Sequence, residues 1–164
     1  MDIDDGMTLA RDATAAPTRM GKLDSGEIDA LVLALCGLER LGRAELATEI
    51  LSREIMLPAV GQGAPALECR AADEALHRLL EPLHDPRSAA CVGAERAMLA
   101  ALDGSCRTPI AGLAELDGNR LVVEGLVLKP DGGGEIRDHR AGAIADAEAL
   151  GTERDRAGPG FWLG

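Results

Sequence analysis

Leu102-Asp103-Gly104-Ser105-Cys106-Arg107-Thr108-Pro109-Ile110 is the stretch in which a predicted helix ends and a predicted strand begins. Gly104 lets the chain turn after the helix, and Cys106 lies in that turn beside Arg107. A thiol is usually activated by a helix N-terminus or a cationic neighbour. Cys106 instead follows a helix C-terminus, whose dipole disfavours a thiolate, while Arg107 opposes that effect. These residues leave two interpretations open: an idle structural thiol, or a thiol that captures one strong electrophile and keeps it as a thioether.

The chain on both sides of this turn predicts an α+β domain. Asp85-Pro86 is a typical helix start, and apolar positions continue that helix over 86–103. Three strand candidates and a short final helix follow, at Thr108–Leu116, Arg120–Lys129, Glu135–Ala141 and 143–150. Asp- and Gly-containing turns separate the strands, so we expect a three-stranded antiparallel sheet with one face covered by helices.

The earlier part of the chain reads as α/β. Thr18 can cap a helix from Arg19 to Ser25, and the apolar run from Glu27 to Leu35 is typical of a strand buried on both faces. A second helical piece then begins at Leu38. Open α/β sheets bind ligands beyond the carboxyl ends of their strands, which would bring Arg19 and Arg40 to one crevice. The alternative is that both arginines are solvated surface residues.

A glycine-containing loop joins the two halves. Ala44–Glu54 predicts a helix, and residues 56–64 then predict a hinge or tight crossover, with a ligand loop as the alternative. Gln62 is the side chain of this loop that can hydrogen-bond a ligand. Ala66–Cys69 is strand-like, and an apolar helical face follows as far as Leu83.

Composition narrows the function classes. The 164 residues carry a net charge of −11 and include one Phe, one Trp and no Tyr, which argues against nucleic-acid or anionic-membrane partners. The cysteines lack C-x-x-C spacing and His77 and His84 lack a ligand cluster, so we expect no metal site. Cys36, Cys69 and Cys91 are expected to behave as small hydrophobic residues. No secretion signal or membrane span is apparent, which predicts a cytoplasmic protein.

Three separated stretches resemble one family. Residues 18–42 (TRMGKLDSGEIDALVLALCGLERLG), 57–70 (LPAVGQGAPALECR) and 94–110 (AERAMLAALDGSCRTPI) are similar to porphobilinogen deaminase, also called hydroxymethylbilane synthase. The resemblance implies a transferase of tetrapyrrole (haem) biosynthesis, which joins four porphobilinogens with loss of ammonia to give hydroxymethylbilane. It implies that Cys106 holds a dipyrromethane cofactor as a thioether, and that Arg19 and Arg40 bind pyrrole carboxylates. Gln62 would lie near the bound pyrroles.

The resemblance covers only the later part of that family. The domain with the catalytic aspartate has no counterpart here, so we assign no catalytic residue, and a separate chain could supply that domain. We expect a truncated chain that is inactive alone; the alternative is a non-catalytic remnant or a module that binds a small anion or a partner. The expected organisation is a disordered leader (1–17), the end of a periplasmic-binding-like α/β domain (18–57), a hinge and crossover belonging to the first domain (58–85), a cofactor-anchoring α+β domain (86–151) and an irregular tail (152–164). The 64–83 piece would lack its own sheet, and we expect it to be poorly packed or held differently.

Overall fold

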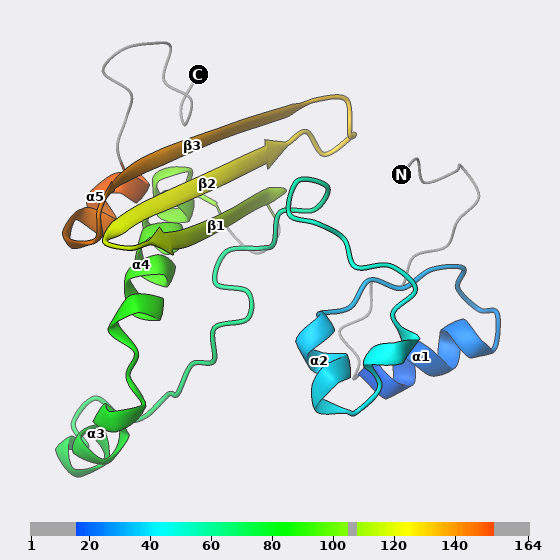
Figure 1. The fold of residues 1–164 in the computed structure, drawn as a ribbon, viewed down its shortest axis with the longest axis horizontal. Coiled ribbons are helices and arrows are strands. Elements are labelled where there is room, and N and C mark those ends of the chain that lie inside the picture. The colour runs from blue at the N-terminus through cyan, green and yellow to red at the C-terminus, as the bar shows by residue number, and fades with distance from the viewer. Residues whose placement is uncertain (1–15, 105–107, 153–164) are drawn as a thin grey trace. The chain divides into compact units, whose positions relative to one another are not determined.

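The computed structural model describes residues 16–104 and 108–152, which form two compact units divided between Ile50 and Leu51 (Figure 1). The described residues contain helices and one three-stranded antiparallel sheet, as the sequence predicts. The leader at 1–15 and the tail at 153–164 lie outside the described residues.

The sheet of the second unit is a meander with the strand order β1-β2-β3. β1 spans Ile110–Asp117, β2 spans Arg120–Leu128 and β3 spans Glu135–Ala143. The turn between β1 and β2 contains Gly118 with φ of 60°, a left-handed conformation that glycine adopts without a steric penalty. All three strands begin and end within two residues of the predicted bounds.

One face of the sheet packs against two helices, α4 (Pro86–Ala101) and α5 (Ala147–Thr152), the latter preceded by a 3₁₀ turn, η3 (Ile144–Asp146). Inner-facing residues of β2 alternate along the strand, and Leu121 and Val123 are 0% and 1% exposed. Met98 of α4 is also fully buried against them. The predicted covering helix is therefore confirmed. The hydrophobic core of this unit lies between the helices and the inner face of the sheet.

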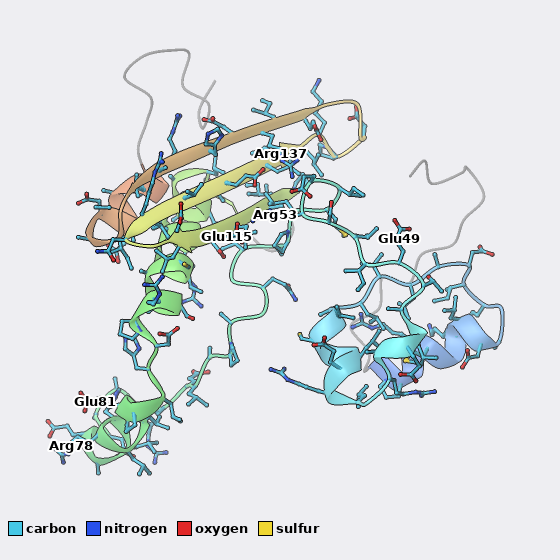
Figure 2. The ribbon with its side chains drawn as sticks, viewed as in Figure 1. Glu49, Arg53, Arg78, Glu81, Glu115 and Arg137 are labelled. Atoms are coloured by element: carbon cyan, nitrogen blue, oxygen red, sulfur yellow. The ribbon has the colours of Figure 1, made fainter. Side chains whose placement is uncertain are left out.

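A segment before the hinge crosses the outer face of the same sheet. The Arg53 guanidinium pairs with the Glu115 carboxylate of β1. Arg137 of β3 donates to the carbonyl oxygens of Arg53 at 2.8 Å and Glu54 at 3.1 Å, and its Nε lies 2.9 Å from the Glu124 carboxylate (Figure 2). These contacts attach residues 53–54 to the sheet.

The first unit contains α1 (Ala16–Asp24), α2 (Leu35–Arg40) and a 3₁₀ turn, η1 (Ala44–Leu46). The strand predicted over Glu27–Leu35 is wrong: residues 27–34 form bends and irregular chain with a single bridge residue at Ala30, and Leu35 begins α2. A strand buried on both faces needs neighbouring strands, and the described residues of this unit contain none. Val32 is accordingly 49% exposed, although it lies within the apolar run.

Three further predictions are corrected. Thr18 does not cap a helix, because α1 begins at Ala16 and includes it. The helix predicted over Ala44–Glu54 is limited to η1. The strand predicted over Ala66–Cys69 is irregular, since no neighbouring strand in the described chain pairs with it.

The segment between the hinge and α4 forms one short helix, α3 (Glu74–Leu80), and a 3₁₀ turn, η2 (Glu81–Leu83). Its apolar side chains are exposed: Leu67 by 63%, Leu79 by 72% and Leu83 by 69%. This agrees with the expectation that the 64–83 piece packs poorly. No helix in the described part of the chain has both the length and the apolar character needed to cross a membrane.

The cap of α4 leads to a pH prediction. The Ser88 hydroxyl and backbone N–H both donate to the Asp85 carboxylate, at 2.5 Å and 3.1 Å, and these bonds hold its pKa below the ordinary value. Because the pKa of Asp85 is lowered by folding, its charged form stabilises the folded state. This contribution is complete above the unfolded-state pKa of about 4 and is lost as the pH falls through the folded-state pKa. Asp85→Asn keeps a capping oxygen without the charge. Urea unfolding should show the wild type more stable at pH 7, with a difference that shrinks as the pH falls below the unfolded-state pKa; a constant difference would contradict this.

Candidate functional site

The predicted cofactor cysteine falls in a gap between two well-held elements. Cys106 lies outside the described residues, but the chain before and after it is described. Leu102 ends α4, and Asp103 follows in the left-handed region with φ of 51°. The Asp103 N–H donates to Ala100 O at 3.1 Å and the Gly104 N–H donates to Leu99 O at 2.9 Å. This pair of bonds is the Schellman motif that closes a helix C-terminus.

Gly104 has a different role from the one predicted for it. Asp103 takes the left-handed conformation, which aspartate tolerates better than most residues. Gly104 instead lies in a crowded position, because a Cβ there would lie 2.5 Å from Leu99 Cδ1 and 2.8 Å from Ile110 Cδ1, and these side chains would have to move. The end of α4 and the start of β1 thus approach each other closely on either side of residues 105–107.

The loop predicted to act as a hinge forms a tight turn at Val60–Gly63. Gly61 and Gly63 have φ of 70° and 85°, so both need the freedom of glycine. The Gln62 N–H donates to Ala59 O at 3.0 Å, while the Gln62 side chain is exposed. The backbone of this turn is therefore constrained, and its one amide side chain is free to meet a ligand.

Glu95 holds this turn, and sequence reasoning gave it no role. The side chain is 5% exposed, and its two oxygens accept from different segments: Oε2 from the Gly61 N–H at 2.6 Å and Oε1 from the Ala114 N–H at 2.8 Å. The available signal was a carboxylate on the apolar face of a helix, between Ala94 and Met98. Such a group must be hydrogen-bonded when buried.

Arg19 and Arg40 lie on α1 and at the end of α2, in the first unit. Arg19 is half-buried and Arg40 is exposed. Their predicted placement at one crevice required a strand at 27–35, which the structure does not contain. Their role in binding carboxylates stays a prediction that rests on the resemblance.

The other cysteines have distinct surroundings. Cys36 is exposed, contrary to the expected small hydrophobic residue, because α2 presents it away from the one buried side chain of that helix, Leu38. Cys69 is partly buried, with Sγ 3.8 Å from His77 Nε2. Burial, followed by the charge of Glu95, raises the pKa of the Cys91 thiol and disfavours its thiolate. In the described ranges, no three or more metal-ligating side chains gather.

Comparison with known proteins identifies relatives over most of the chain. A family model described as "Porphobilinogen deaminase, dipyromethane cofactor binding domain" matches residues 13–78, and one described as "Porphobilinogen deaminase, C-terminal domain" matches residues 89–155. Curated proteins named porphobilinogen deaminase from Nitrobacter winogradskyi and Nitrobacter hamburgensis are each 46% identical over 150 residues. The alignments cover 88% of this chain and 48% of each relative, so the chain spans about half the length of the curated relatives it matches.

Proposed function

Because the chain belongs to the porphobilinogen deaminase family, we propose that it provides the later half of a hydroxymethylbilane synthase. The whole enzyme would be a cytosolic transferase that joins four porphobilinogens, with release of ammonia, to give hydroxymethylbilane. The part with the catalytic aspartate would come from a separate chain or from a sequence adjoining this one. In this proposal residues 18–57 end the second domain, residues 58–85 form the hinge and crossover, and residues 86–151 anchor the cofactor.

The donor groups of the chain fit the dipyrromethane cofactor that the matching family model names. Its attachment needs one thiol, and the proposal assigns this role to Cys106. Its acetate and propionate groups need cations, and the guanidiniums of Arg19 and Arg40 suit carboxylates because they can pair with both oxygens. The Gln62 amide can bond a pyrrole N–H or a carboxylate. When bound, dipyrromethane supplies the pyrrole end to which substrate units are added.

One observation supports the proposal most strongly. The range matched by the C-terminal family model, 89–155, contains most of α4, the segment with Cys106 and all three strands in unbroken order. The described chain on both sides of residues 105–107 is held by the Schellman motif and by the start of β1. A thiol carried between two fixed elements can hold a covalently attached group in a defined region.

The test is covalent loading of the purified chain with hydroxymethylbilane. The Cys106 thiol replaces the hydroxyl of the ligand: a C–S bond forms, a C–O bond breaks and water leaves. Intact mass should therefore rise by the mass of hydroxymethylbilane less one water, and Ehrlich's reagent should stain the product. We expect Cys106→Ala to take up no adduct.

Cys36→Ala is the matched control, because Cys36 is an exposed thiol that a non-selective electrophile would reach. This variant should load as the wild type does, and Arg19→Ala and Arg40→Ala should load more slowly. Adduct retained in Cys106→Ala, or no adduct in the wild type at any ligand concentration, would contradict the proposed site.

A further inference from the structure

We propose that Glu95 is a positioning residue. It holds the turn that contains Gln62 against α4 and β1, the elements before and after Cys106 in the chain. This inference rests on the proposed function for its consequence, but the contacts that carry it are observed. One buried carboxylate bonds to the turn through the Gly61 N–H and to β1 through the Ala114 N–H. Because Glu95 belongs to α4, a single side chain joins the helix before Cys106, the strand after Cys106 and the turn with Gln62.

The free edge of β1 explains why this arrangement is favourable. β1 pairs with β2 on one side only, so alternate N–H groups along its other edge need partners. The Gly112 N–H donates to Pro58 O at 2.9 Å, and the Ala114 N–H donates to Glu95. The hinge therefore runs along this edge, attached directly at Pro58 and through the carboxylate at Gly61.

The turn would lose its attachment if the carboxylate were changed. Glu95 is 5% exposed, so water cannot readily replace it as the acceptor for the Gly61 N–H. Gly61 and Gly63 are both in the left-handed region, and a glycine-rich turn without this bond has many accessible conformations. The backbone that carries the exposed Gln62 side chain would then no longer be held in one conformation.

Glu95→Gln removes one acceptor oxygen and places an amide NH₂ against a backbone N–H. Hydrogen–deuterium exchange of the Gly61 and Gln62 amides should become about tenfold faster than in the wild type. The rate of hydroxymethylbilane adduct formation at Cys106 should fall about tenfold, as in Gln62→Ala. Because Glu95 acts through Gln62, the double variant should be no slower than the slower single variant.

Leu150→Ala is the control. Leu150 lies in the same core at 8% exposure, so its truncation lowers stability, but it removes none of the hydrogen bonds that hold the turn. It should reduce the melting temperature and leave both the exchange of Gly61 and the adduct rate unchanged. Effects of Glu95→Gln and Gln62→Ala that multiply, or an equal loss of rate in Leu150→Ala, would overturn the inference. So would unchanged Gly61 exchange.

Two arrangements keep the test decisive. If Glu95→Gln does not fold, Glu95→Asp is used, because the shorter carboxylate keeps its charge but cannot reach both N–H groups. If the wild-type chain takes up no adduct, the proposed function fails, while the exchange of Gly61 still decides whether Glu95 holds the turn.

Discussion

Gly151→Ala is expected to lower the free energy of unfolding of the second unit by about 3 kcal/mol, and its melting temperature by roughly 10–20 °C. Gly151 lies where α5 crosses α4. A Cβ at this position would collide with Ala94 O, and it would lie 2.8 Å from Ala97 Cβ and 2.9 Å from Met98 N. Two of these atoms belong to the α4 backbone, so the whole helix would have to move. Thermal unfolding followed by circular dichroism measures the effect.

Gly93→Ala is a matched control for this substitution. Gly93 lies in the interior of α4, and no atom approaches within 4 Å of a Cβ built there. Alanine in a helix interior is about 1 kcal/mol more favourable than glycine, so this variant should be as stable as the wild type or more stable. Equal losses in Gly93→Ala and Gly151→Ala would show that the close approach of the helices is not what requires glycine at 151.

Met98→Ala is expected to cost about 3 kcal/mol in the free energy of unfolding. Met98 is fully buried between α4 and the inner face of the sheet, and its methyl group fills the space beside Gly112 that a side chain would otherwise occupy. Truncation leaves a cavity under β1 and removes the apolar contacts of the whole side chain. Urea unfolding at pH 7 gives the comparison with the wild type.

Met98→Leu separates packing from any special property of the thioether. Leucine keeps nearly the same volume, so the loss should stay below about 1.5 kcal/mol. A loss as large as that of the alanine variant would mean that side-chain shape, and not buried volume, governs this site.

The strands and the final helices were predictable because their signals are local. Alternating apolar residues marked β1 and β2, and Gly118 marked the turn between them, within a few residues of each other in the chain. Asp85 followed by Pro86 likewise marked the start of α4. Such patterns bury their own apolar face against the next element, so neighbouring sequence was enough to read them.

The predicted strand at 27–35 and the role of Glu95 depend on distant residues. The apolar run at 27–35 is typical of a buried strand, but a strand forms only where another strand accepts its hydrogen bonds. Glu95 is 34 residues from Gly61 and 19 from Ala114, and no local pattern connects them. The left-handed conformation of Asp103 was not predicted either, because glycine is the usual residue in that conformation at the end of a helix and Gly104 follows directly. The close approach of Gly104 to Ile110 appears only in the folded chain.

The sequence by itself determined the family and the meander with its covering helix. It also predicted the residues proposed to hold a covalently attached pyrrole chain: Cys106, Arg19, Arg40 and Gln62. Only the tertiary structure decided that a buried carboxylate ties the hinge to β1 and that α5 needs glycine where it crosses α4. It also decided that the apolar run of the first unit is not a strand. Residue type and spacing record local preference and chemical capacity, whereas hydrogen bonds and close approaches between distant segments exist only once the chain has folded.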